Sequence, residues 1–264
     1  MISIIISTHK PNLLNDITEN IHKTIGVEHE IISIENHNKY SLCEAYNIGA
    51  DKANFPYLCF VHEDVIFLTK DWGSYLIDLM ESDKKIGLVG VVGTKFISTY
   101  PSTGWGTGPY VTNMYRGKIF LDKHLNYRDF DIQDKKKDIE DVVSMDGLFL
   151  FSKKEVFSKC RFDSTMLTGF HGYDTDYCLQ VLFSNYRVIT SRKLELIHFS
   201  PGCYNKEYAS ANKKIKEKWK NKLPVSSSDL NFNQRVNHYY NILCWIGYLR
   251  NMIIRKFKLP FKLK

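Results

Sequence analysis

Three polar residues, His62, Glu63 and Asp64, interrupt an apolar stretch of the sequence. They follow the run Tyr57 to Val61, which is apolar enough throughout to predict a strand buried on both faces. Ligands of open α/β sheets bind beyond the carboxyl ends of such strands, and a carboxylate there can hold a divalent cation against phosphate oxygens. A capping Asp beside an ordinary hydrogen-bonded histidine would explain the same residues, so this stretch alone leaves both interpretations open.

A second acidic cluster precedes an apolar-periodic segment further along the chain. Asp174 and Asp176 would occupy the first turn of a helix, where the helix dipole favours carboxylates. Capping explains one of them, whereas two of them behind a glycine-flanked loop with His171 and Tyr173 indicate a general base facing a cleft. His198 ends a later apolar run and could share one cation with the first cluster, since imidazole and carboxylate both suit Mn²⁺. Without the other candidate residues, a histidine after a strand is more commonly structural.

Polar side chains also end the first two predicted strands. Ser7 and Thr8 follow the first strand and Glu35 ends the second. Their convergence on one sheet edge would suit a nucleotide, because the Glu35 carboxylate could accept a hydrogen bond from a base N–H. Asn47 and Gly49 lie on the helix between them and the first cluster, and Gly49 either contacts a ligand or lets that helix pack close to the sheet. Loops after strands are commonly polar, so none of these residues is sufficient alone.

Strands and helices alternate through the first part of the chain. Strands are predicted at 2–7, 30–35, 57–62 and 86–92, separated by helices at 12–24, 42–53 and 72–82. This order predicts a parallel sheet with right-handed crossovers. Residues 93–144 break the pattern around a glycine-rich segment at Trp105 and suggest an irregular substrate loop or small hairpins. A strand at 147–152, a helix at 174–184 and strand material at 186–197 follow.

The positive charge is concentrated in the C-terminal part of the chain. Residues 205–264 hold 14 Lys and Arg against 3 Asp and Glu, whereas residues 1–204 hold 22 against 26. Basic residues interleaved with large apolar ones suit an anionic membrane surface, where each contributes about 1 kcal/mol. A solvated helix packing on the main domain is the alternative. Nucleic acid would also accept such a tail, although we expect no nucleic-acid partner.

Cysteine usage and hydropathy bear on the compartment. The six cysteines show no CxxC spacing and several lie in apolar runs, which favours a reduced, cytoplasmic setting. The N-terminus lacks the basic leader and apolar core of a signal peptide. No uncharged apolar stretch reaches about 18 residues, so we expect no membrane-spanning helix. We therefore expect a cytoplasmic protein whose basic part lies peripherally at the inner face of the cell membrane.

Taken in order, these motifs resemble the family 2-like glycosyltransferases with the GT-A fold. IIISTHK looks like the family's first strand, and SLCEAYNIGADKANFPYLCFVHEDV is similar to its Asn-x-Gly helix leading into the acidic metal motif. MDGLFLFSKKEVF, HGYDTDYCLQ and IHFSPG resemble its Asp-Gly segment, the acidic motif of its base-bearing helix and its later histidine segment. The resemblance implies an α/β domain over residues 1–204 with a mostly parallel central sheet flanked by helices. Residues 1–92 would bind the nucleotide, 93–204 would serve the acceptor and catalysis, and 205–264 would form a basic helical extension.

The resemblance also implies an activity and site roles. The activity is inverting, metal-dependent transfer of a sugar from a nucleotide-diphosphate donor, taken as a UDP-sugar, to a glycan or lipid-linked acceptor in surface polysaccharide biosynthesis. Asp64 and His198 would bind Mn²⁺ or Mg²⁺, and Asp174 would deprotonate the acceptor hydroxyl, unless it exchanges roles with Asp176. Donor and nucleotide contacts would come from Ser7, Thr8, Glu35, Asn47, His62, Asp64 and Asp146. Acceptor or loop roles would fall to Trp105, Gly147, His171, Tyr173 and Asp176.

The chain departs from the family pattern at several positions. His62 and Glu63 alter the metal motif, so ligation by His62 stays open and Glu63 is expected to be a bystander. Tyr173 replaces a common Glu, and Gln180 replaces a frequent Arg. Two alternatives are a sugar nucleotidyltransferase, which would need a glycine-rich phosphate loop that STHKPNLLND lacks, and an inactive glycosyltransferase-like binding subunit, against which the retained acids argue.

Overall fold

The computed structural model describes residues 1–100, 137–200, 205–227, 238, 239, 241–247 and 249. Its strands are β1 Ile2–Thr8, β2 His29–Glu35, β3 Tyr57–His62, β4 Val65–Phe67, β5 Ile86–Gly90, β6 Gly93–Thr94, β7 Phe96–Ile97, β8 Ile139–Asp141, β9 Ser144–Met145, β10 Phe149–Lys153, β11 Arg187–Ser191, β12 Leu196–His198 and β13 Val225–Ser226. Its helices are α1 Pro11–Thr24, α2 Leu42–Lys52, α3 Trp72–Ser82, α4 Lys154–Lys159, α5 Tyr173–Phe183 and α6 Lys206–Lys218. Residues 238, 239, 241–247 and 249 are also helical.

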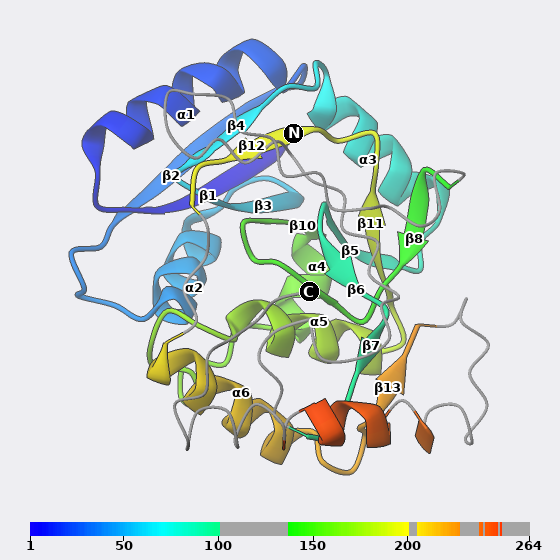
Figure 1. Cartoon of the computed structure of the whole chain (residues 1–264). Coiled ribbons are helices and arrows are strands. Elements are labelled where there is room, and N and C mark those ends of the chain that lie inside the picture. Colours follow the sequence, from blue (N-terminus) through cyan, green and yellow to red (C-terminus); the bar gives the residue numbers. More distant parts are fainter. Residues whose placement is uncertain (101–136, 201–204, 228–237, 240, 248, 250–264) are drawn as a thin grey trace.

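The central sheet has the order β2-β1-β3-β10-β5-β11-β8 (Figure 1). Strands β1, β2, β3, β5 and β11 run in one direction, and β10 and β8 run against them. The prediction of a mostly parallel sheet flanked by helices is therefore confirmed. The position of β10 was not predicted: it inserts antiparallel between β3 and β5, so its first residues lie beside the last residues of β3.

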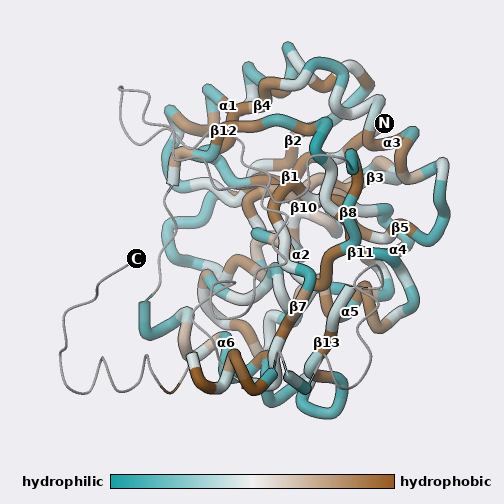
Figure 2. Tube along the Cα trace, turned by 45° about the vertical axis from the view of Figure 1, so that its right-hand side comes forward, coloured by the Kyte–Doolittle hydropathy of each residue, from teal (hydrophilic) through white to brown (hydrophobic). Residues whose placement is uncertain are grey.

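Helices cover both faces of this sheet and bury two apolar clusters. Alternate residues of each strand face opposite sides, so Ile4 and Ile6 pack with α1 and α3 while Ile5 packs with α2. The central strands are correspondingly hydrophobic along their length in Figure 2. The sequence alternation of strand and helix thus produces a three-layer α/β arrangement.

Helix α2 is capped at its start and packs closely on β1. Ser41 caps it by accepting a hydrogen bond from the Glu44 N–H, and the Glu44 side chain accepts one from the Ser41 N–H in return. A Cβ at Gly49 would lie 2.3 Å from a methyl carbon of Ile5 on β1. Of the two interpretations of Gly49, a ligand contact or close packing of the helix on the sheet, the structure supports close packing.

Helix α6, the first part of the basic segment, packs on the core of the main domain. This is one of the two alternatives that the sequence left open for it. Ala211 and Ile215 of α6 are buried in the apolar cluster that also holds α2 and α5. Gly172 precedes α5 with φ +85°, and a Cβ there would lie 2.8 Å from Ile215 Cδ1. After α6, β13 pairs antiparallel with β7. The first part of the basic segment is thus joined to the main body by burial.

The segment predicted to be irregular, 93–144, contains short strands at both described ends. β6 pairs with β9, and β8 pairs with β11 at the edge of the main sheet. Residues 101–136, which include Trp105, lie outside the described residues, so the substrate-loop hypothesis for them stays a prediction. Within the described part of the chain, no helix is both long and apolar enough to cross a bilayer.

Candidate active site

The carboxyl ends of three neighbouring strands meet at one edge of the sheet. β1 is flanked by β2 and β3 in a register that sets Thr8 opposite Glu35 and Ser7 opposite His62. β10 adds its amino end to the same edge, because Phe149 pairs with Val61 in the antiparallel direction. The Asp146-Gly147 turn that precedes β10 is therefore delivered to the edge where a ligand of an open α/β sheet binds.

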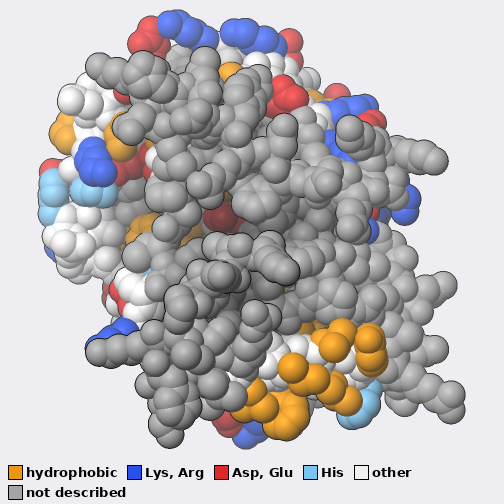
Figure 3. Space-filling model, viewed as in Figure 1, with side chains coloured by type: hydrophobic (Ala, Val, Ile, Leu, Met, Phe, Trp, Pro, Cys, Tyr) orange, Lys and Arg blue, Asp and Glu red, His pale blue; other side chains and the backbone are white. Residues whose placement is uncertain are grey.

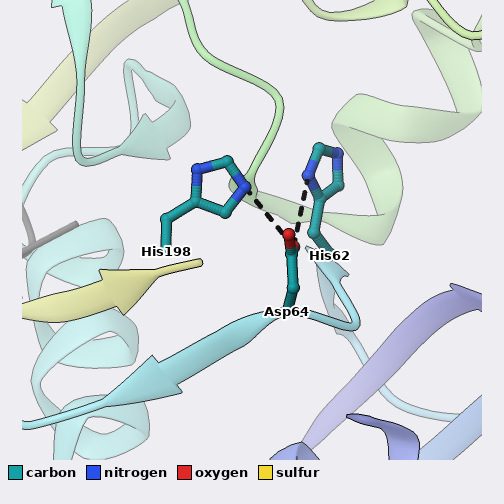
Figure 4. Close-up of side chains that lie close together, drawn as sticks. All are labelled: His62, Asp64 and His198. Carbon is teal, nitrogen blue, oxygen red and sulfur yellow. Dashed lines mark ion pairs between the residues drawn. The ribbon is translucent and has the colours of Figure 1, made fainter. Parts of the chain in front are cut away.

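His62, Asp64 and His198 come together at this edge, although the sequence separates them widely (Figure 4). β12 pairs antiparallel with β4, and this pairing sets His198 opposite Val65, next to Asp64. His198 Nε2 lies 3.4 Å from Asp64 Oδ1, and His62 Nδ1 lies 4.0 Å from the same oxygen. The structure thus brings together the two predicted metal ligands and adds His62, whose participation the sequence left open.

The electrostatics of this group favour a neutral His62 beside an ionised Asp64. Burial, reinforced by the neighbouring His198, lowers the pKa of His62 to about 4. Burial opposes ionisation of Asp64, but the nearby His198 outweighs it and lowers the pKa of the carboxyl. Burial likewise opposes protonation of His198, and the Asp64 carboxylate outweighs it and raises the pKa of that imidazole. The free lone pairs of a neutral imidazole and a carboxylate are what a divalent cation binds.

The residues fit a divalent cation. His198 Nε2 is buried and lies 3.4 Å from Asp64 Oδ1 without a regular hydrogen bond to any residue that the structure describes, which leaves it available to a cation that Asp64 also binds. The three donor atoms lie within 4.8 Å of one another. Donors bound at about 2.0–2.2 Å in tetrahedral or octahedral geometry lie roughly 3–4 Å apart, so small side-chain movements would complete the site. A ligand set of two nitrogens and one oxygen suits Mn²⁺ better than it suits a cation that prefers oxygen ligands only.

Asp64 can be reached from solvent. It borders a pocket of about 300 Å³ between α1 and β4 that Asn20 and Phe199 also line. The Asp64 side chain is 20% exposed, whereas that of His198 is 11% exposed. A ligand entering from this side would meet the carboxylate before the histidines.

Asp174 lies in the first turn of α5 and reaches back to the Asp146-Gly147 turn. Its Oδ2 accepts a hydrogen bond from the Gly147 N–H at 3.1 Å, and its Oδ1 accepts one from the Thr175 N–H at 2.7 Å. Burial, together with the negative charge of Asp146, raises the pKa of Asp174 to about 7. A carboxylate with a pKa near neutrality, held at the same edge as the histidines, has the properties of a general base.

Asp176 has a different environment from Asp174. It is 1% exposed, and its carboxylate accepts hydrogen bonds from Trp219 Nε1, Lys218 Nζ and Gln180 Nε2, each at 2.8 Å. The residue that precedes α5 as its cap is Gly172, so Asp176 is not the cap. Asp176 instead fastens α6 to α5, which favours a structural role for it and leaves Asp174 as the candidate base.

Tyr173 connects the two halves of the site. Its hydroxyl lies 2.7 Å from His62 Nε2, and it precedes Asp174 at the start of α5. His171, in the preceding loop, packs edge-on against Tyr208 of α6 with ring centroids 5.5 Å apart. Burial lowers the pKa of His171. Of His171 and Tyr173, the structure brings Tyr173 to the cation group.

The remaining predicted site residues have contacts within the protein. Ser7 Oγ accepts a hydrogen bond from Asn36 Nδ2 at 3.2 Å, and exposed Glu35 lies 3.0 Å from His37 Nε2. The Asn47 amide donates to the Phe162 carbonyl at 2.9 Å. These positions leave their donor-binding roles as predictions.

Glu63 has a role that sequence reasoning missed. Its carboxylate accepts hydrogen bonds from Thr8 Oγ1 at 2.5 Å and from the N–H groups of His9 and Lys10 at 3.1 Å. It stays outside the cation group, as expected, but it anchors the loop after β1. Buried Thr8 therefore uses its hydroxyl to bind Glu63. A buried acid beside a strand end was the available signal, but its partners lie 53–55 residues away.

The sequence of the chain corresponds to a known family. A family model described as "Glycosyltransferase like family" matches residues 3–222. The chain belongs to this glycosyltransferase-like family. The match includes every residue of the cation group, Asp174 and all of α6.

This glycosyltransferase-like chain is similar in structure to "GalNAc-T7 with UDP, GalNAc and Mn2+", with a TM-score of 0.58 and 13% sequence identity. The alignment covers 84% of this chain and 49% of the GalNAc-T7 chain, so this chain spans about half of that protein's length. The similarity confirms the GT-A fold. The structure of A197 from STIV aligns with a TM-score of 0.40 and 16% identity, over 75% of this chain and 85% of that one, and it carries no argument. No curated protein matches the chain.

Proposed function

We propose that the protein transfers a sugar from a nucleotide-diphosphate donor to an acceptor hydroxyl, with a divalent cation held at His62, Asp64 and His198. The observation that carries this proposal is the placement of Asp174, with a pKa near 7, at the same sheet edge as the three candidate ligands. Membership of a glycosyltransferase-like family and the GT-A fold support the reaction class. UDP-sugar is the proposed donor, in keeping with the UDP and Mn²⁺ named for the GalNAc-T7 structure.

In the proposed reaction, the Asp174 carboxylate takes the proton of the acceptor hydroxyl. The acceptor oxygen then forms a bond to the anomeric carbon of the donor sugar while the bond from that carbon to the diphosphate oxygen breaks. The electron pair of the broken bond leaves with the nucleoside diphosphate. Because attack and departure occur on opposite faces in a single displacement, the configuration of the anomeric carbon inverts.

Each part of the site has a proposed task in this displacement. Asp64, His62 and His198 would hold Mn²⁺ or Mg²⁺, which when bound stabilises the negative charge of the leaving diphosphate. Asp146 would contact the donor-sugar hydroxyls, and its turn is oriented by the hydrogen bond from the Leu148 N–H to Asp146 Oδ1 at 3.1 Å. The Gly147 N–H holds the carboxylate of Asp174 toward the same turn.

The proposed acceptor is a glycan or lipid-linked glycan at an anionic membrane surface. The C-terminal helical residues are anchored on one side, where Cys244 is buried and Asn241 Oδ1 accepts a hydrogen bond from the Thr99 N–H at 2.8 Å. The other side exposes large apolar side chains, namely Tyr239, Ile242, Trp245 and Ile246. Hydrophobic side chains gather over this region in Figure 3. Exposed apolar groups beside a strongly basic sequence suit an interfacial position on anionic lipid.

A peripheral cytoplasmic location, with a role in surface polysaccharide assembly, is part of the same proposal and depends on the proposed membrane contact. The residues after the helical segment, 250–264, contain six Lys and Arg and no Asp or Glu. Their charge would draw the chain to anionic lipid, and the aromatic and aliphatic groups would enter the interface. The proposed catalytic domain is 1–204, with 205–264 as the extension that carries this contact.

A donor panel with and without Mn²⁺ tests the proposed function. We expect transfer or slow hydrolysis of a UDP-sugar that requires the cation. We expect Asp64→Ala to lose this activity together with cation-dependent donor binding. Glu155→Gln is the matched control, because Glu155 is an exposed acid on α4 after the far end of β10. Absence of transfer and hydrolysis across all donors would favour an inactive binding subunit. Pyrophosphate release from a nucleoside triphosphate and a sugar phosphate would favour a nucleotidyltransferase.

A further inference from the structure

The hydroxyl of Tyr173 is placed to control how His62 faces the cation group. We propose that Tyr173 is a positioning residue that holds the His62 imidazole so that its Nδ1 completes the cation site as the third ligand. Its oxygen lies 2.7 Å from His62 Nε2, on the side of the ring away from Asp64. The inference rests on the proposed cation-dependent function and concerns a residue that departs from the family pattern.

The phenol of Tyr173 is held rigidly by its surroundings. Tyr173 is 4% exposed, and its ring meets Tyr46 and Phe162 edge-on at centroid distances of 5.7 and 5.8 Å. A Cβ at Gly147 would lie 2.0 Å from the Tyr173 oxygen. A glycine at 147 is therefore what leaves room for the hydroxyl beside His62.

The hydrogen bond between Tyr173 and His62 has a direction that metal binding requires. A neutral imidazole carries its proton on one nitrogen and offers a lone pair on the other. When Tyr173 accepts the proton of Nε2–H, Nδ1 is left free as a ligand beside Asp64 and His198. Metal-bound histidines commonly donate their second nitrogen to such an outer partner, which fixes the tautomer and the ring orientation. The Tyr173 oxygen occupies the position of that partner.

The same contacts join the cation group to the candidate base. Tyr173 is followed directly by Asp174, and Gly147 both accommodates the Tyr173 hydroxyl and donates its N–H to Asp174. The first turn of α5 therefore sets the orientation of a cation ligand and of the base from one rigid element. Replacement of Tyr173 should therefore affect cation binding before it affects the base, because Asp174 keeps its own backbone hydrogen bonds.

Binding of Mn²⁺ alone, measured by calorimetry on the full chain, tests the inference. Tyr173→Phe removes the oxygen and is expected to weaken Mn²⁺ binding about 10- to 100-fold, the effect typical of an outer-shell partner. Tyr177→Phe is the matched control, since buried Tyr177 lies one turn on in α5 and donates to Ser152 Oγ at 3.2 Å. It is expected to leave Mn²⁺ affinity unchanged. In a His62→Ala background, Tyr173→Phe should have no further effect.

The outcomes separate this inference from the proposed function. Equal Mn²⁺ affinity of the wild type and Tyr173→Phe would overturn the positioning role and leave the cation site standing. A wild-type chain that binds neither Mn²⁺ nor Mg²⁺ would overturn both. If Tyr173→Phe does not fold, nitrogen NMR of histidine-labelled wild-type protein still decides the matter. A His62 ring protonated on Nε2 is expected, and one protonated on Nδ1 would contradict the inference.

Discussion

His198 Nε2 lies 3.4 Å from Asp64 Oδ1 across 134 positions of sequence, and the pairing of two three-residue strands accounts for it. β4 and β12 form a separate small sheet that sets His198 beside the residue after Asp64. The imidazole is buried, and its Nε2 faces the Asp64 carboxylate as an ion pair without a regular hydrogen bond to any described residue. The chemistry of the site follows from this pair and from Asp174, the candidate base.

Replacement of Asp174 tests its role as the base. Asp174→Asn keeps the shape of the side chain and one of its two acceptor oxygens but cannot take a proton, so transfer should fall about 10²-fold or more while donor affinity is nearly unchanged. Initial rates and donor calorimetry provide the two measurements. Asp176→Asn is the comparison, since Asp176 binds α6, and its folded fraction should retain turnover. Wild-type turnover in Asp174→Asn would remove Asp174 from the role.

The pH dependence of kcat/KM follows from the pKa of Asp174. The base must be ionised, and its pKa is raised to about 7 by burial and by Asp146, so the rate should rise with pH and level off above about 7. Asp146→Asn removes a negative charge that disfavours ionisation of Asp174. The pKa should fall and the rising limb should move to lower pH, whatever the loss in maximum rate. A limb that stays in place would show that Asp146 does not act on Asp174.

Fastening of α6 to α5 should be visible in stability. Lys218→Met leaves the buried Asp176 carboxylate without its ionic partner, and the free energy of unfolding should drop by about 1–3 kcal/mol. Lys220→Met is the matched control: Lys220 pairs with exposed Glu217 on the protein surface, where such a pair contributes about 0–1 kcal/mol. Denaturant titration of both variants measures the difference. Equal stability of the two variants would mean that the Lys218–Asp176 pair does not help to hold α6 on α5, which would leave the Trp219–Asp176 hydrogen bond as the connection.

The C-terminal segment should bind anionic liposomes. Truncation after Pro224 removes seven of the 14 Lys and Arg of residues 205–264, together with the exposed apolar side chains. Co-sedimentation with anionic vesicles should therefore decrease, and added salt should weaken the binding of the full chain. Trp245→Ser and Ile246→Ser in the full chain should reduce binding while leaving the charge unchanged. Neutral vesicles are the control. Equal sedimentation of full and truncated chains would leave only the packing role.

Much of the fold was predictable because its elements have strong local patterns. The apolar run before His62 and the alternation around it predicted β3 and its neighbours closely, and the helix predicted at 42–53 is α2, Leu42–Lys52. Asp64, His198 and Asp174 were identified because acids and a histidine follow apolar runs in the order seen in a known family. Strand ends in a parallel sheet share an edge, so this part of the site follows from element order.

The remaining features depend on contacts between distant residues, which local patterns do not encode. Nothing in the sequence near Asp176 or Glu63 shows that one binds Trp219 and the other the loop after β1. Nor does it show that β10 inserts antiparallel, which is what brings Gly147 to Asp174. The sequence by itself determined the elements, the edge they share and the residue types available there. Only the tertiary structure decided which of those residues meet, because strand pairing and helix packing select the partners of each side chain.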